Sequence, residues 1–158
     1  MNILDVAAYL DPYFLEIEKI GFDLKNYPLD HLGISATSSE QYESRKIELL
    51  EPGELVREHI VSDRRISVFK LKNQLKYKQY VIAAIELVEP IKDEVNPIDG
   101  FEHVEFTIDV PFEEIVSVYP QIAWNTKSMN RPDFPRLKLV FPDGKELKLN
   151  RTPILNEA

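Results

Sequence analysis

Residues 30–35 read DHLGIS and residues 102–107 read EHVEFT, so one six-residue pattern occurs twice in the chain. In each copy an acidic residue precedes a histidine, and apolar residues then alternate with others up to a final hydroxyl residue. This alternation is typical of a β-strand with one apolar and one polar face. A pattern that recurs within a chain indicates two copies of one structural unit.

The chain around the first copy predicts a strand, a helix and three further strands. Residues 29–36 contain the first copy and form the strand. Residues 37–50 form the helix, which begins at a capping box of Thr37 and Glu40. Runs rich in β-branched and aromatic residues then predict three strands, at 54–61, 65–71 and 79–88.

The same order of elements begins again at the second copy, after an acidic connector at residues 90–100. A strand at 101–110 leads into a helix at 111–119, which has a proline in its first turn. The remaining runs predict three more strands, at 122–127, 136–141 and 145–151.

The N-terminal part of the chain is predicted to be helical. Residues 2–20 have helical apolar spacing that is interrupted at Asp11-Pro12, which predicts two short helices. We therefore expect one α+β domain over residues 1–158. It consists of a helical segment (1–28), a first βαβββ half (29–90) and a second βαβββ half (101–151).

Composition narrows the classes of function. With 158 residues and 44% hydrophobic content, the chain can bury a core. The absence of cysteine excludes disulfides, iron–sulfur clusters and thiolate zinc sites. A net charge of −8 disfavours nucleic-acid binding. With no apolar run of membrane length and no basic, signal-like start, we expect a cytoplasmic protein without a membrane partner.

His31 and His103 hold equivalent positions in the repeat, so two halves related by a twofold axis would bring them face to face. Imidazole is the commonest ligand of transition metals in proteins. Glu86 lies in the almost wholly apolar run VIAAIELV, where an ionised carboxylate is costly unless it is paired or binds a metal. Either histidine alone is more typical of a hydrogen-bonded strand residue, but the repeat together with Glu86 favours a metal site. His59 has no counterpart in the second half and is predicted to be exposed.

The ordered set of these features resembles the vicinal-oxygen-chelate (glyoxalase-like) superfamily and, within it, the YecM-type bacterial proteins. The resemblance runs from about residue 20 to residue 150 and is carried by residues 30–35, 65–71, 85–87, 100–105 and 142–145. It implies a cupped, mostly antiparallel sheet with helices outside. It also implies a divalent metal ion (Mn, Fe, Ni, Co or Zn) that binds oxygens of a small-molecule ligand.

The resemblance further implies which residues hold the metal. His31, Glu86 and His103 match the expected ligand positions. Many superfamily members place a glutamate in the last strand as a fourth ligand, and Asn150 is the nearest residue here by its distance from the closing turn. Two histidines and one carboxylate with open positions suit iron, manganese or another first-row divalent ion.

Other polar residues are predicted to lie around the metal. Glu105 shares a strand face with His103 and is the candidate catalytic base, or a carboxylate that orients a ligand. Arg65, with Ser67 on its face, and Lys148 are candidates for binding an anionic group of a substrate. The alternative for these residues is a hydrogen-bonded polar wall of the cup.

Three hypotheses for function follow. The first is a metal-dependent enzyme, of the isomerase, lyase or dioxygenase kind, that acts on a small oxygen-rich substrate. The second is a non-catalytic protein of the same fold that binds or sequesters a small molecule. The third is a protein–protein module that has lost the site. The substrate, the reaction, the native metal and the oligomeric state stay open.

Overall fold

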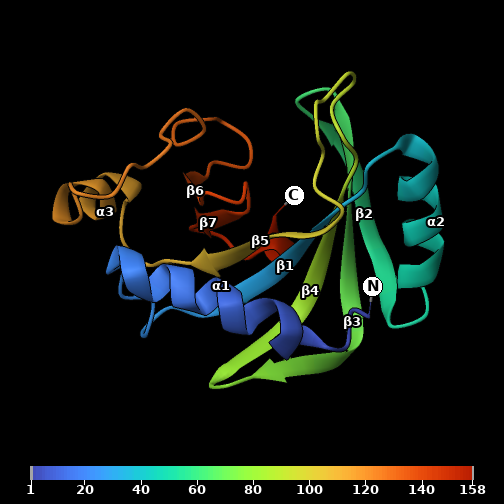
Figure 1. Cartoon of the computed structure of the whole chain (residues 1–158), viewed down its shortest axis with the longest axis horizontal. Helices are drawn as coiled ribbons and strands as arrows, with labels where there is room; N and C mark the ends of the chain where they lie inside the picture. The colour runs from blue at the N-terminus through green and yellow to red at the C-terminus, as the bar shows by residue number, and fades with distance from the viewer. Residues whose placement is uncertain (1, 158) are drawn as a thin grey trace.

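The computed structural model describes residues 2–157 and contains one seven-stranded sheet in the order β2-β3-β4-β1-β5-β7-β6 (Figure 1). The first half supplies β1 (Leu29–Ser35), β2 (Gly53–Val61), β3 (Arg64–Tyr77) and β4 (Tyr80–Val88). The second half supplies β5 (Gly100–Thr107), β6 (Leu137–Val140) and β7 (Glu146–Asn150). The helices are α1 (Val6–Ile20), α2 (Ser39–Leu49), α3 (Phe112–Val118) and the 3-10 helix η1 (Ile154–Asn156). None of the helices in residues 2–157 has the length and apolar content that crossing a membrane requires.

The centre of the sheet is the antiparallel pair of β1 and β5. Each of these two strands has a parallel neighbour on its other side, β4 beside β1 and β7 beside β5. All other neighbouring strands are antiparallel, so the halves repeat one arrangement on the two sides of the central pair. The predicted fold class, an α+β chain with a mostly antiparallel sheet after an N-terminal helix, is confirmed.

A single helix replaces the two short helices predicted before the sheet. Helix α1 continues through Pro12, although a proline in a helix interior costs about 3 kcal/mol. The buried residues of α1 lie on both sides of this proline, at Val6, Leu10, Tyr13 and Ile17. Because this whole stripe packs into the core, burial outweighs the local break.

The N-cap of α2 lies one residue later than predicted. The hydroxyl of Ser38 accepts a hydrogen bond from the backbone N–H of Gln41 at 3.0 Å. The Gln41 side chain in turn accepts the backbone N–H of Thr37 at 2.7 Å. Ser38 and Gln41 therefore cap the helix in place of the predicted pair, Thr37 and Glu40.

Within residues 2–157, the second half has two strands after its helix, where three were predicted. Residues 122–127 form only one β-bridge, between Asn125 and Lys138. The ring of Trp124 packs edge-on against Phe22, at a centroid distance of 5.2 Å. This aromatic contact draws the segment toward the chain that follows α1, so it does not run along the sheet.

The main helices pack on one face of the sheet, and the other face carries polar residues together with a small apolar cluster of Val68, Ala84 and Ile154. Phe106 of β5 meets the ring of Phe14 from α1, and Ser67 of β3 is hydrogen-bonded to Tyr42 of α2. Figure 1 shows α2 beside β2 and β3 at one end of the molecule and α3 at the other. Because side chains alternate between the faces of a strand, the neighbours of these residues point to the opposite side.

Phe106 gives a test of this packing. Its side chain is fully buried and its ring contacts Tyr80 at a centroid distance of 5.5 Å. Phe106→Ala should lower the free energy of unfolding by about 3–5 kcal/mol, because it leaves a cavity in the core. Val118→Ala, at a 62% exposed position of α3, should change it by less than about 0.5 kcal/mol. Urea denaturation measures both, and equal effects of the two changes would contradict the packing.

Candidate metal centre

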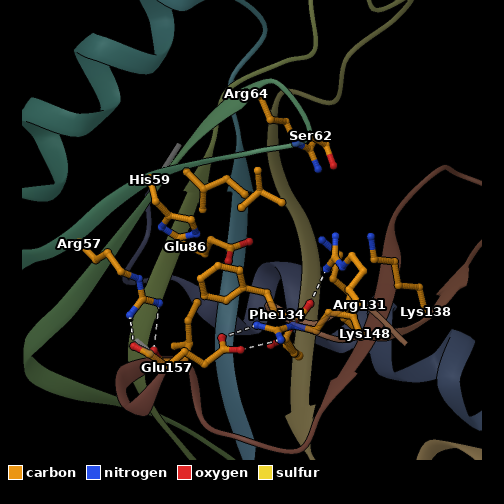
Figure 2. Close-up of a pocket in the computed structure, with 15 residues that line it drawn as sticks. Arg57, His59, Ser62, Arg64, Glu86, Arg131, Phe134, Lys138, Lys148 and Glu157 are labelled. Carbon is orange, nitrogen blue, oxygen red and sulfur yellow. Dashed lines mark hydrogen bonds and ion pairs between the residues drawn. The ribbon is translucent and has the colours of Figure 1, made fainter. Parts of the chain in front are cut away.

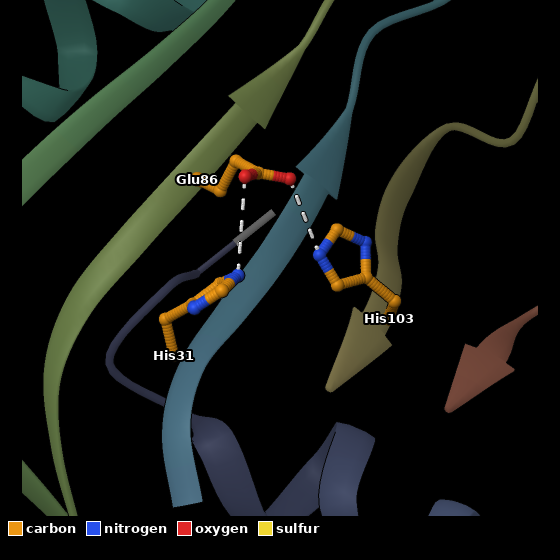
Figure 3. A group of neighbouring side chains, drawn as sticks. All are labelled: His31, Glu86 and His103. Carbon is orange, nitrogen blue, oxygen red and sulfur yellow. Dashed lines mark ion pairs between the residues drawn. The ribbon is translucent and has the colours of Figure 1, made fainter. Parts of the chain in front are cut away.

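His31, Glu86 and His103 come from three neighbouring strands, β1, β4 and β5. Figure 3 shows that both imidazole rings approach the Glu86 carboxylate. Its Oε2 lies 3.9 Å from Nε2 of His31, and its Oε1 lies 3.3 Å from Nε2 of His103. One ligand atom from each residue lies within 4.8 Å of the others. The structure thus brings together the three residues predicted to bind the metal.

Gly33 creates the space in which the His103 ring lies. In the register of the sheet, Gly33 is opposite His103 on one side and opposite Glu86 on the other. A Cβ atom at Gly33 would lie 1.9 Å from Cε1 of His103, far inside contact distance. The imidazole therefore lies over bare backbone and reaches toward Glu86.

Both Nε2 atoms are buried and, among the described residues, neither has a hydrogen-bond partner. A buried polar atom without a partner costs free energy, which a bound cation would relieve. Burial raises the pKa of Glu86, but contact with His103 and the charge of a protonated His31 hold that pKa well below its usual range. Two imidazole nitrogens and one ionised carboxylate form a donor set that fits a first-row divalent ion.

Each imidazole is held on its other side by the acidic residue that precedes it. Nδ1 of His31 lies 2.8 Å from Oδ2 of Asp30, and Nδ1 of His103 lies 3.2 Å from Oε1 of Glu102. A carboxylate that accepts the Nδ1–H leaves the Nε2 lone pair free for a metal. Burial raises the pKa of Glu102, but the hydrogen bond from His103 brings it down to about 2. No role was predicted for these two carboxylates, although an acidic residue precedes the histidine in both copies of the repeat and so could have indicated that it orients the ring.

Glu105 is buried beside the centre, with its Oε2 3.7 Å from Nδ1 of His31. Its Oε1 accepts the Nε–H of Arg136 at 2.9 Å, and the amide of Asn150 also donates to the carboxylate. Burial raises the pKa of Glu105, but the charges of Arg136 and His31 lower it by more. With Asp30 and His31, Glu105 forms a second group of possible ligands. Its predicted role as a base stays a prediction.

Asn150 lies beside the centre, next to Asp30 and Glu105, and its predicted role as a fourth ligand stays a prediction. Its Nδ2 donates to Oδ2 of Asp30 at 3.2 Å and to the carboxylate of Glu105. Its Oδ1 accepts the hydroxyl of Thr107 at 2.6 Å. The amide of Asn150 is therefore occupied in holding neighbouring side chains.

Lys148 takes the place in the second half that Glu86 takes in the first. The parallel pair β5–β7 sets Lys148 opposite Glu105, as the parallel pair β1–β4 sets Glu86 opposite Gly33. Lys148 is 6% exposed. By register, the counterpart of the Glu86 carboxylate is thus an ammonium group.

Arg65 and Ser67 lie away from the centre, on the face of β3 that α2 covers. Arg65 forms an ion pair with Glu89 at 2.6 Å, and its guanidinium lies 4.4 Å from the ring centroid of Tyr42. Ser67 is hydrogen-bonded to Tyr42. Arg64, the preceding residue, and Ile66 are the residues of β3 that line the pocket on the metal side. A shift of one residue along a strand moves a side chain to the other face.

A pocket of about 60 Å³ opens beside the metal centre, and Figure 2 shows the residues that line it. Glu86 lines it, as does Lys148, one of the predicted substrate contacts. His59, predicted to be exposed, is half-buried here and stacks on Phe134 at a centroid distance of 4.8 Å. The open side of the metal centre therefore faces a space that is lined mainly by polar residues.

The solved structures with a similar fold define the class of protein, the vicinal-oxygen-chelate fold. The structural-genomics protein EC4020 matches with a TM-score of 0.72 at 20% identity, over 96% of this chain and 88% of its own. Methylmalonyl-CoA epimerase of Streptomyces coelicolor, in complex with 2-nitronate-propionyl-CoA, matches with a TM-score of 0.51 at 16% identity. That match covers 77% of this chain and 94% of the epimerase. Identities this low show a shared fold and no more.

Within that class the family is defined by sequence. The model of the YecM protein family matches residues 3–155, so the chain belongs to the YecM family. An uncharacterised protein of Haemophilus influenzae is 33% identical over 115 residues, a stretch that is 70% of this chain and 59% of that relative. The resemblance found in the sequence is thus confirmed.

The centre predicts metal binding at about one ion per chain. His31→Ala and His103→Ala should each abolish binding of Mn, because each removes a ligand, whereas His59→Ala should retain it. Binding should weaken below about pH 6, because a protonated imidazole cannot donate its lone pair. Calorimetry with chelator-treated protein measures this. Binding that survives both of the first two changes would exclude the site.

The space over Gly33 gives a second test. Gly33→Ala should weaken metal binding about 10- to 100-fold, because the new methyl group displaces the His103 ring. It should also lower the thermal midpoint of the metal-free protein. In a His103→Ala background the same change should cost much less stability, because the ring is gone. Equal costs in the two backgrounds would show that the clash does not occur.

Proposed function

We propose that this protein binds one divalent first-row metal ion through His31, Glu86 and His103 and acts as an enzyme on a small oxygen-rich molecule. The observation that carries the proposal is the pair of buried, unpartnered Nε2 atoms that converge with one carboxylate beside a pocket. A divalent ion held there would supply a Lewis acid for an oxygen atom of the bound molecule. The fold alone does not select a reaction.

Glu105 is the residue proposed to move a proton. Its carboxylate lines the pocket and lies next to His31, so a molecule bound at the centre is within its reach. The hydrogen bonds from Arg136 and Asn150 fix its position. Burial raises the pKa of Glu105, but the charges of Arg136 and His31 lower it by more and keep the carboxylate ionised, so it can accept a proton, although the lowered pKa makes it a weaker base.

The fold neighbours support a small-molecule ligand. The Streptomyces coelicolor protein is an epimerase in complex with a CoA derivative, and it covers 77% of this chain. The CoA derivative is a ligand of the epimerase. The pocket of this protein measures about 60 Å³. This volume is well below the roughly 300–1,000 Å³ of pockets that enclose drug-sized ligands, so the space suits a very small molecule or one small group of a larger molecule.

A second candidate function is a non-catalytic binding protein of the same fold. It is favoured by Lys148, which stands where the repeat would place a second carboxylate, and by the two side chains that already occupy Glu105. The two candidates differ in turnover. Both require the metal centre, so loss of binding in the histidine variants would exclude both.

The first experiment is elemental analysis of protein purified without a tag or a chelator. We expect about one first-row metal ion per chain. A thermal-shift screen of small carboxylates, diketones and hydroxy acids, with and without Mn, then finds a ligand. Stabilisation by a hit should disappear in His103→Ala. A hit that stabilises His103→Ala equally well would contradict the proposal.

Once a substrate is known, Glu105→Gln tests whether Glu105 is the catalytic base. We expect turnover to fall by about 10²- to 10⁴-fold while the metal is retained, because the amide cannot accept the proton. Glu102→Gln is the matched control, since it changes a carboxylate that holds His103 from the far side. It should weaken metal binding more than Glu105→Gln does. Metal loss in Glu105→Gln would instead make Glu105 a ligand.

A further inference from the structure

The lining of the pocket beside the metal centre is positively charged, whereas the protein as a whole is negatively charged. The chain carries a net charge of −8. The pocket, in contrast, is lined by six arginine or lysine residues and three glutamates, the cations being Arg57, Arg64, Arg131, Arg136, Lys138 and Lys148. In Figure 2 Arg131 and Lys138 lie on one side of the pocket, across from Arg57 and His59.

Two of these six cations are satisfied by the protein itself. Arg136 pairs with Glu105 at 2.9 Å and with Glu157 at 2.6 Å. Arg57 donates to the backbone carbonyls of Ile154 and Glu157. These contacts tie the C-terminal segment to the pocket and use up the glutamates other than Glu86.

The other four cations have no ion pair within residues 2–157: Arg64, Arg131, Lys138 and Lys148. Arg131 donates one hydrogen bond from Nη2 to the backbone carbonyl of Phe134 at 2.5 Å. The Nε atoms of Arg64 and Arg131 are buried without a hydrogen-bond partner. Lys148 is only 6% exposed. Arg64, Arg131 and Lys138 are half-buried. Four partly or fully desolvated cations without a carboxylate partner are unfavourable, so an anion among them would complete the cluster.

The strands hold these cations close to one another in spite of their repulsion. Lys138 of β6 is directly opposite Lys148 of β7. Burial, together with the charges of Lys148, Arg131 and Arg64, lowers the pKa of Lys138 to about 8. An anion among these groups would remove both the repulsion and the desolvation cost.

We propose that this pocket is an anion site, which selects small ligands bearing a carboxylate or phosphate group held by Arg64, Arg131, Lys138 and Lys148. Guanidinium and ammonium groups are the donors that proteins use for such oxyanions. Glu86 lines both the pocket and the metal centre, so the anionic group lies next to the metal. As a substrate class the inference rests on the proposed function, but the cations themselves bind with or without the metal.

The test is calorimetry with malonate and with inorganic phosphate, on chelator-treated and on Mn-loaded protein. Lys138→Met and Arg64→Met should each weaken binding by about tenfold or more in both forms, because each removes a charged donor. Lys70→Met is the matched control, since Lys70 is an exposed lysine on β3. It should change the affinity by less than about twofold. Tighter binding of malonate would indicate a ligand with a carboxylate group, and tighter binding of phosphate would indicate a ligand with a phosphate group.

A stability measurement separates an anion site from a structural role. Without an anion, Lys138→Met should raise the thermal midpoint by about 2–4 °C, because it removes a repelled charge. With malonate, the variant should lose the upward shift that the unaltered protein shows. A midpoint lowered by Lys138→Met would overturn the inference, since the lysine would then stabilise the fold itself.

The remaining outcomes keep the two proposals apart. If the chelator-treated protein binds neither anion at 10 mM, or if binding requires Mn and ignores Lys138→Met, the anion site is excluded while the metal centre stands. If Mn does not bind but the lysine and arginine changes still abolish anion binding, the anion site stands and the proposed metal function fails.

Discussion

Strands β1 and β5 pair antiparallel at the centre of the sheet, and the metal centre takes its geometry from that pairing. The register sets Gly33 opposite His103 and His31 opposite Glu105, which joins residues that are far apart in the sequence. The parallel neighbours then bring Glu86 to one side and Lys148 to the other. A slip of one residue between β1 and β5 would turn the histidines to the helix-covered face and dismantle the centre.

The polar face of the sheet combines two opposite electrostatic demands. A metal centre needs ionised carboxylates and imidazoles whose Nε2 lone pair is free, and Asp30 and Glu102 direct the proton of each neutral ring to Nδ1 by accepting the Nδ1–H groups. The pocket beside it concentrates cations, of which only part are neutralised by Glu105 and Glu157. An acidic surface elsewhere on the chain keeps the net charge negative, so the sign of the pocket is not visible in the composition.

The sequence was sufficient for the fold class and for the prediction that His31, Glu86 and His103 lie close together, because a repeat, a strand pattern and a carboxylate in an apolar run all agreed. It was not sufficient where two neighbouring residues are alike, so Arg65 was chosen although Arg64 faces the pocket. Asn150 was chosen by its distance from a turn and stays a prediction, whereas the pairing of parallel strands makes Lys148 the counterpart of Glu86 by register. The absent strand at 122–127 depends on an aromatic contact with Phe22, which local pattern does not reveal.

The difference between Gly33 and Glu105 has a consequence for how the two halves relate. They hold the same position in the two copies of the repeat, yet one leaves room for a ring and the other carries a carboxylate. A symmetric pair of first halves would have glycine at both places and would lack the Glu105–Arg136 ion pair, since both residues belong to the second half. A symmetric pair of second halves would have glutamate at both places, and the space that the His103 ring now fills over Gly33 would be lost. The centre as it stands therefore needs one half of each kind, because the glycine makes room for a ring and the glutamate supplies a carboxylate.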